Sequence, residues 1–258
     1  MKRNPRIIKL KSLRNLRTLA GIETKDGKTI KRDILLRSAA LDHITPEDFA
    51  TLRDQYKLKK VIDLRTKGEA EKKPDMTYEG VEYCYIPVCP DAIPGVSREI
   101  EPGQDKALEL IPDLVDIYLG VVKGEEYIEN ISKSIRAIMQ NEEGAVLWHC
   151  TAGKDRCGFV TVFILWMLGV DMTVIKEDYL LTNLDAIKDA RKYYWLVRIF
   201  KRNKAIAKRV YAAYMADLKY LDSALGYVKE QGGMDEFIEN KLKISREEIE
   251  NFREKALN

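Results

Sequence analysis

The stretch Ala145-Val146-Leu147-Trp148-His149-Cys150-Thr151-Ala152-Gly153-Lys154-Asp155-Arg156-Cys157-Gly158 places a short apolar run directly before a polar turn. The run follows Glu142-Glu143-Gly144 and is too short for a helix, so it predicts a fully buried strand. Residues 158–168 are typical of a buried helix. The turn from Cys150 to Arg156 then joins a strand to the start of a helix, where unpaired N–H groups and the helix dipole attract an anion.

The rest of the chain predicts an α/β fold with a central, mainly parallel sheet flanked by helices. We expect a turn at Asp26-Gly27, a helix from Pro46 capped by Thr45, and strands at 61–64 and 81–88. Helices at 107–122 and 125–140 lead to the strand at 145–149, and the sequence after Gly169 is almost entirely helical in character. This order predicts one domain over residues 1–258, with 184–258 as a helical extension.

Composition excludes several classes of function. The 44 basic and 41 acidic residues give a net charge of +3, so we expect no general binding to nucleic acid. The four cysteines lack Cys-x-x-Cys spacing and the chain has two histidines, so we expect no metal and no cofactor. The basic N-terminus has no apolar segment typical of a secretory signal, and residues 159–170 are shorter than the roughly 20 needed to span a bilayer. We therefore expect a cytoplasmic protein.

Cys150 and Arg156 have the chemistry of a nucleophile and an anion ligand. A thiol at a helix N-terminus has its pKa lowered from about 8.5 to roughly 3.5–7.5, so Cys150 is expected to be a thiolate near neutral pH. The planar guanidinium of Arg156 can hold two phosphoryl oxygens. Gly153 allows backbone angles that turn N–H groups inward, and Gly158 permits close helix packing.

Residues 149–156, His-Cys-Thr-Ala-Gly-Lys-Asp-Arg, closely resemble the catalytic loop of cysteine-dependent protein tyrosine phosphatases. The likeness is greatest to the bacterial tyrosine phosphatase and phosphoinositide phosphatase family that carries Ala-Gly-Lys-Asp-Arg in this loop. Three further stretches fit this family: Leu36-Arg37-Ser38-Ala39-Ala40-Leu41, Val61-Ile62-Asp63-Leu64-Arg65-Thr66 with Glu69, and Asp178-Tyr179-Leu180-Leu181-Thr182-Asn183. The resemblance covers about residues 10–185, and it also suggests that the C-terminal helices form a lid.

The resemblance implies a two-step phosphomonoester hydrolysis without a metal. Cys150 takes the phosphoryl group and water then hydrolyses the phosphocysteine. The phosphate-binding residues would be Thr151, Ala152, Gly153, Lys154 and Arg156. A carboxylic acid must protonate the leaving alcohol, and two residues compete for that role. Asp155 lies in the loop as in the nearer family, whereas Asp91 follows Pro90, where other tyrosine phosphatases place their acid.

Four further residues are expected to support the loop. Cys157 stands where the family usually carries Ser or Thr, and its weaker thiol donor predicts slower breakdown of the phosphocysteine. Cys157 could alternatively fill a small buried space or form a reversible disulfide with Cys150. His149 is interpreted as hydrogen-bonding locally rather than tuning Cys150. Asp63 and Arg65 are interpreted mainly as a structural ion pair.

Two cationic features admit alternatives. Lys154 is either the ligand of a second phosphate or a solvated lysine at the rim. Residues 191–202, Arg-Lys-Tyr-Tyr-Trp-Leu-Val-Arg-Ile-Phe-Lys-Arg, form a basic amphipathic helix with Tyr193, Leu196, Val197 and Phe200 on one face. Such a helix either packs on the protein as surface helices ordinarily do or contacts an anionic membrane.

The expected substrates are phosphotyrosine proteins and phosphoinositides, and the oligomeric state is left open. A nucleotide phosphate loop is excluded because Gly153-Lys154 lacks the required glycine five residues earlier and is followed by Asp155. A sulfur transferase would leave Arg156 and the acidic candidates without a purpose. The remaining alternative is a pseudophosphatase that binds phosphorylated partners or lipids without turnover, against which Cys150, Arg156 and two candidate acids are present.

Overall fold

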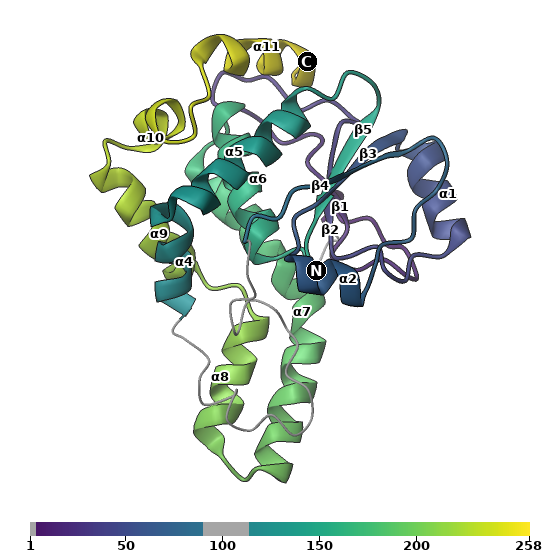
Figure 1. The fold of residues 1–258 in the computed structure, drawn as a ribbon, viewed down its shortest axis with the longest axis vertical. Coiled ribbons are helices and arrows are strands. Elements are labelled where there is room, and N and C mark those ends of the chain that lie inside the picture. Colours follow the sequence, from purple (N-terminus) through teal and green to yellow (C-terminus); the bar gives the residue numbers. More distant parts are fainter. Residues whose placement is uncertain (1–3, 90–113) are drawn as a thin grey trace.

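The structure is a computed structural model that describes residues 4–89 and 114–258, with a five-stranded sheet at its centre (Figure 1). The strands are β1 (Arg17–Thr18), β2 (Leu35–Ser38), β3 (Leu58–Asp63), β4 (Glu82–Tyr85) and β5 (Ala145–His149). Their order is β1-β2-β5-β3-β4. β2, β5, β3 and β4 run parallel and β1 pairs antiparallel with β2, which confirms the predicted mainly parallel sheet.

β5 occupies the middle of the sheet, and all five of its residues are buried. Successive side chains of a strand point to opposite faces. Val146 and Trp148 therefore contribute to the larger of two hydrophobic cores, while Ala145 and Leu147 contribute to the smaller one. The apolar residues 145–148 thus pack into the cores on both faces of the sheet, as expected of a fully buried strand.

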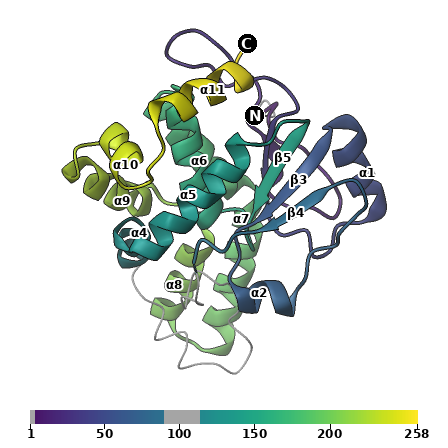
Figure 2. The ribbon, with the colours of Figure 1, turned by 45° about the horizontal axis from the view of Figure 1, so that its top comes forward.

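Helices cover the two faces unequally. α1 (Pro46–Gln55) covers the smaller core, and its Thr45 cap and Pro46 start match the prediction. α4 (Leu114–Lys123), α5 (Glu125–Met139) and α6 (Asp155–Met167) contribute to the larger core. Figure 2 shows α5 and α6 on one side of the sheet and α1 on the other. The short α2 (Lys67–Lys72) follows β3.

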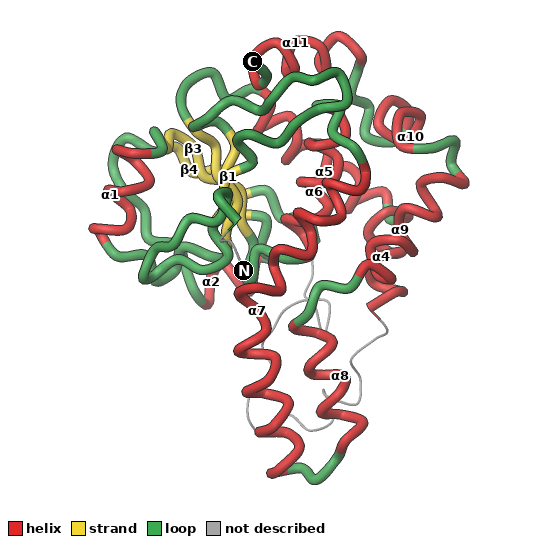
Figure 3. Tube along the Cα trace, turned by 180° about the vertical axis from the view of Figure 1, so that it is seen from behind, coloured by secondary structure: helices red, strands yellow, loops and turns green. Residues whose placement is uncertain are grey.

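The C-terminal third is helical, as expected, but the predicted boundary at residue 184 lies inside one long helix. The helices are α7 (Met172–Phe200), α8 (Lys204–Tyr214), α9 (Leu218–Glu230), α10 (Met234–Asn240) and α11 (Arg246–Ala256). α7 and α8 run side by side and project from the body, as Figures 1 and 3 show from opposite sides. α9 to α11 return to the body, where Tyr220, Val228 and Phe252 join the larger core.

Several predicted bounds need correction. α6 begins at Asp155 rather than at residue 158, so the end of the polar turn is already helical. The strand expected at 81–88 spans Glu82–Tyr85, and the helix expected at 107–122 is described from Leu114 onward. The turn at Asp26-Gly27 is present, with an isolated antiparallel bridge between Glu23 and Thr29. Among the described residues, no helix combines the length and the apolar character needed to cross a membrane.

Candidate active site

The loop from Cys150 to Lys154 lies at the carboxyl end of the central strand and leads directly into α6. The carboxyl ends of parallel strands form one edge of the sheet, where ligands of such folds bind. Asp63, the last residue of β3, pairs with His149, the last residue of β5. The Cys150 side chain is buried at this edge. Asp63 and Cys150 therefore lie at the same edge of the sheet, since Cys150 directly follows His149.

The loop is held from outside through its carbonyl groups. Asn15 Nδ2 donates to the carbonyls of Ala152 and Gly153 at 2.9 and 3.0 Å, and Arg37 donates to that of Gly153 at 2.9 Å. The C=O and N–H of a trans peptide point in opposite directions. The amides of Gly153 and Lys154 are therefore turned to the other side of the loop, where they are available to an anion.

Gly153 is required by both its conformation and its packing. Its φ of +64° lies in the left-handed region that favours glycine, and a Cβ there would lie 2.3 Å from the Ser38 carbonyl oxygen. At Gly158 a Cβ would lie 3.2 Å from the ring of Tyr179, so this glycine brings α6 close to α7. Both glycine roles proposed from the sequence have a structural basis here.

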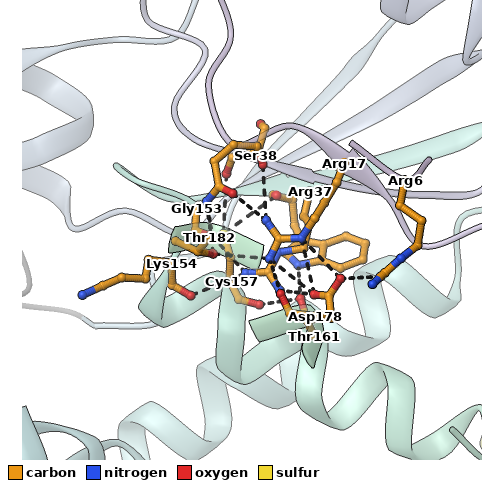
Figure 4. A network of polar contacts seen from close by, with 12 residues as sticks. Arg6, Arg17, Arg37, Ser38, Gly153, Lys154, Cys157, Thr161, Asp178 and Thr182 are labelled. Carbon is orange, nitrogen blue, oxygen red and sulfur yellow. Dashed lines mark hydrogen bonds and ion pairs between the residues drawn. The ribbon is translucent and has the colours of Figure 1, made fainter. Parts of the chain in front are cut away.

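A buried carboxylate behind the loop holds the arginines in place (Figure 4). Asp178 lies 2.6 Å from Arg6, 3.3 Å from Arg17 and 3.1 Å from Arg37. Burial alone would raise the pKa of Asp178, but Arg17 and Arg37, followed by Arg6, outweigh it and lower the pKa to about 2. Arg37 thus connects this cluster to Gly153 of the loop. The sequence stretches containing Arg37 and Asp178 resembled the family, yet their pairing was not predicted.

Arg156 is fixed by a bidentate ion pair with Glu69. Its two terminal nitrogens lie 2.5 and 2.9 Å from the Glu69 carboxylate oxygens, and the Thr151 hydroxyl donates to the same carboxylate. Burial alone would raise the pKa of Glu69, but the hydrogen bond and charge of Arg156 dominate and lower it to about 2. Arg156 Nε is buried and has no hydrogen-bond partner within the described part of the chain. This donor is suited to a phosphoryl oxygen.

Cys150 has the electrostatic environment of a stable thiolate. Burial opposes its ionisation, but the hydrogen bond from the Cys157 thiol and the positive charge of Arg156 lower the pKa of Cys150 well below its usual value. Burial and the neighbouring Cys150 raise the pKa of Cys157, so Cys157 keeps its proton and can donate it. Cys150 and Cys157 are not joined by a disulfide. Cys157 therefore provides the type of contact that a Ser or Thr hydroxyl would supply at this position.

Asp155 opens α6 and is held by Tyr118, which in turn contacts Tyr179. Neither tyrosine was assigned a role from the sequence, although Tyr179 lies in one of the stretches that resemble the family. The Tyr118 hydroxyl on α4 contacts Asp155 Oδ1, and Tyr179 Oη on α7 lies 2.7 Å from Tyr118 Oη. Burial, followed by the Asp155 charge, raises the pKa of both phenols, so both keep their protons. Tyr118 therefore donates to Asp155, and Tyr179 donates to Tyr118. No sequence motif signalled Tyr118, which lies 37 residues from Asp155.

Lys154 is buried, which rules out the solvated lysine considered from the sequence. Its ammonium donates to the carbonyls of Ala213 and Met215 at 2.7 and 3.3 Å. It also lies 3.3 Å from Asp155 Oδ1. Because Ala213 lies in the last turn of α8 and Met215 follows that helix, a cation there satisfies terminal carbonyls and complements the helix dipole. Lys154 thus connects the loop to α8, and its second-phosphate role stays a prediction.

His149, Asp63 and Arg65 form a buried ionic group beneath the loop. Arg65 lies 2.8 Å from Asp63 and 2.9 Å from Asp75, which is the structural ion pair expected for Asp63 and Arg65. His149 Nε2 lies 2.9 Å from Asp75 Oδ2. Burial would lower the pKa of His149, but Asp75 outweighs it and raises the pKa. His149 thus has a charged local partner in Asp75, which had not been identified, but neither ring nitrogen makes a well-aligned hydrogen bond within the described residues, so the local hydrogen bond expected for His149 stays a prediction.

The carboxylates of Asp63 and Asp75 with His149 are the one group in the described ranges whose ligand atoms approach closely enough for a metal. Arg65 already supplies the positive charge between the two carboxylates. A second cation there would be repelled, so this group is better explained as an ion-pair network. Asp91, the other candidate acid, lies outside the described residues.

The profile of the tyrosine phosphatase family matches residues 8–258. A tyrosine-protein phosphatase of Nostoc commune is 29% identical over 58% of this chain and 48% of its own length. The triple specificity protein phosphatase PtpB of Mycobacterium tuberculosis is 29% identical over 61% of this chain and 63% of its own. The chain spans about half to two thirds of the length of these relatives.

Solved structures are more distant. The core catalytic domain of the PP-IP phosphatase SIW14 from S. cerevisiae matches 85% of this chain and 98% of its own, with 14% identity and a TM-score of 0.39. TpbA of P. aeruginosa matches 83% of this chain and 95% of its own, with 12% identity and a TM-score of 0.37.

A cysteine and an arginine, joined by a short loop between a central parallel strand and a helix, are the arrangement of the cysteine-dependent phosphatases. Together with the match over residues 8–258, they establish that the chain belongs to the tyrosine phosphatase family.

Proposed function

We propose that the protein hydrolyses phosphomonoesters through a phosphocysteine intermediate on Cys150. The observation that supports this most strongly is the pairing of two buried groups, Cys150 at the start of the loop and Arg156 in the first turn of α6. Cys150 has a lowered pKa, and Arg156 presents an Nε donor without a partner among the described residues. A thiolate beside a fixed guanidinium can attack a bound phosphoryl group while the guanidinium stabilises the charge that develops.

In the first step, the Cys150 thiolate forms a bond to phosphorus as the bond to the leaving oxygen breaks. Protonated Asp155 gives its proton to that oxygen, which releases the alcohol. In the second step, the Asp155 carboxylate takes a proton from water, which attacks phosphorus and breaks the phosphorus–sulfur bond. Inorganic phosphate leaves and the thiolate is restored. The Cys157 thiol stabilises the departing thiolate as a hydrogen-bond donor.

We propose phosphotyrosine proteins as the principal substrates and phosphoinositides as a second class. Membership of the tyrosine phosphatase family supports the first, and the similarity to the triple specificity protein phosphatase of M. tuberculosis supports a wider range. A screen should compare phosphotyrosine and phosphoserine peptides with phosphoinositides and inositol phosphates. Cys150→Ser provides the blank for every substrate.

An aryl phosphate assay tests the proposed activity. The wild type should turn over the substrate, whereas Cys150→Ser should lose at least about a thousandfold in turnover because serine is not ionised at neutral pH. Cys84→Ser, on β4, is the matched control and should keep wild-type activity. Binding of phosphate without turnover by the wild type would instead support the pseudophosphatase alternative.

A further inference from the structure

The far end of the α7–α8 pair is built differently from the rest of the surface. We define the hairpin tip as residues 191–204, which include the end of α7, the turn and the start of α8. Figures 1 and 3 show the two helices extending together, with the turn at the point farthest from the sheet. Closer to the body, Ala190 of α7 and Ala207 and Val210 of α8 are buried. The hairpin therefore packs on itself.

Large apolar side chains remain exposed on the hairpin tip. Trp195, Ile199 and Phe200 have 59%, 63% and 76% of their surfaces exposed. Trp195 and Ile199 lie one turn apart on the same side of α7. The ring of Tyr193 stacks on Tyr214 of α8 at a centroid distance of 5.1 Å, whereas Phe200 stays exposed. The apolar face expected from the sequence is thus only partly used to pack α7 against α8.

Positive charge is concentrated around these apolar side chains. Residues 190–216 carry eight basic residues and no Asp or Glu: Arg191, Lys192, Arg198, Lys201, Arg202, Lys204, Lys208 and Arg209. The whole chain has a net charge of +3, so the remainder is net negative. Cations gathered at one projecting end repel one another, and an anionic surface would offset that repulsion. Like charge also opposes the approach of a second copy through the same tip.

We propose that the hairpin tip docks on the surface of an anionic lipid bilayer. Trp195, Ile199 and Phe200 enter the region between headgroups and acyl chains, and the surrounding cations contact lipid phosphates. Exposed tryptophan and aliphatic side chains favour this region, and basic residues near an anionic surface each add to the attraction. Vesicle binding is measured without substrate turnover, so a failure of this proposal can be told apart from a failure of the proposed chemistry at Cys150.

Vesicle sedimentation tests the proposal with the full chain. Phosphatidylcholine vesicles containing phosphatidylserine should bind the wild type, and phosphatidylcholine alone should bind it far less. Lys201→Gln with Arg202→Gln should weaken binding about thirtyfold, since each basic residue near the surface contributes about 1 kcal/mol. The triple change of Trp195, Ile199 and Phe200 to Ala should weaken it at least about tenfold. Met76→Ala and Lys67→Gln, at exposed positions outside the tip, should leave binding unchanged.

Tryptophan fluorescence separates docking of the tip from simple charge attraction. The chain has three tryptophans, and Trp195 is the exposed one. Emission should shift to shorter wavelength on anionic vesicles, and the shift should disappear in Trp195→Phe, which keeps the fold. The proposal is overturned if the Trp195 environment does not change, if the triple variant binds like the wild type, or if light scattering shows that the tip joins two protein copies instead.

Discussion

At the residue scale, the lowered pKa of Cys150 distinguishes it from the other cysteines. Hydrogen bonding from Cys157 and the charge of Arg156 favour its thiolate, whereas burial raises the pKa of Cys89 to about 12. Alkylation by iodoacetate followed against pH should therefore give an apparent pKa for Cys150 well below the free-thiol value of about 8.5. Cys89 and Cys157 should stay unmodified near neutral pH. Peptide mass spectrometry identifies the modified cysteine.

Arg156→Ala provides the control for this profile. Removing the guanidinium takes away a positive charge that favours the thiolate, so the apparent pKa of Cys150 should rise. Inorganic phosphate should protect Cys150 of the wild type from alkylation. This protection should be lost in Arg156→Ala, because phosphate needs the same guanidinium. An apparent pKa of Cys150 in the wild type at or above the free-thiol value of about 8.5 would refute the electrostatic account of this residue.

Tyr118 is a positioning residue for Asp155, and its removal should affect proton donation rather than binding. Tyr118→Phe keeps the ring but deletes the hydroxyl that contacts Asp155. We expect kcat to fall about tenfold to a hundredfold for alkyl phosphates, whose leaving groups need a proton, and much less for nitrophenyl phosphate. KM should change little. A uniform loss across leaving groups would mean that Tyr118 has only a structural role.

The same leaving-group series separates the two candidate acids. Asp155→Asn should show a steeper dependence on the leaving group than the wild type, since Asp155 is held beside the loop by Tyr118. Asp91→Asn should behave as the wild type. A steeper dependence in Asp91→Asn, with none in Asp155→Asn, would identify Asp91 as the acid that protonates the leaving group.

At the scale of elements, Lys154 attaches the loop to the end of α8. Lys154→Met keeps much of the side chain's volume but removes donors to the carbonyls of Ala213 and Met215. Hydrogen bonds to a charged group contribute about 1.5–3 kcal/mol. Amide hydrogen exchange in residues 204–216 should therefore become faster in the variant, while exchange in β5 stays slow. Unchanged exchange in α8 would leave Lys154 with a role only in binding phosphate.

Elements were predictable where local sequence decides them. The apolar run at 145–149 specifies a buried strand, and Thr45-Pro46 specifies the start of α1. The start of α6 was placed too late because Asp155, Arg156 and Cys157 look like a continued turn, although they form its first helical turn. Glycine at position 153 signalled the loop's conformation correctly, since its positive φ needs no distant partner to be recognised.

The partners of the loop were less predictable because they come from distant parts of the chain. Tyr118 and Asp75 belong to no motif near residue 150, yet they contact Asp155 and His149. Asp178 and Arg17 form an ion pair although they lie 161 residues apart in the chain. Sequence spacing does not report such contacts, although an arginine inside the buried strand β2 signals that a buried partner must exist.

At the scale of the whole molecule, Asp178 joins the N-terminal segment, the sheet and α7 through Arg6, Arg17 and Arg37. Asp178→Asn leaves these arginines without their carboxylate, so the free energy of unfolding near pH 7 should fall by about 3–5 kcal/mol. Chemical denaturation measures this change. Asp116→Asn, on the exposed side of α4, is the control and should unfold as the wild type does.

The same variant tests the pH dependence. The folded-state pKa of Asp178 is about 2, below its usual value, so its contribution is present above about pH 4 and is lost as pH falls toward 2. The stability difference between wild type and Asp178→Asn should therefore shrink by about 2 kcal/mol over that range. A difference that stays constant with pH would contradict the buried carboxylate's role.

Cys150 as the nucleophile is the central claim, and trapping the intermediate tests it most directly. The enzyme is mixed with an aryl phosphate, quenched within the first turnover and digested for mass spectrometry. We predict one phosphoryl group on the peptide that contains Cys150, and none in Cys150→Ser. A phosphoryl group on another residue, or hydrolysis that continues at the wild-type rate in Cys150→Ser, would contradict the account.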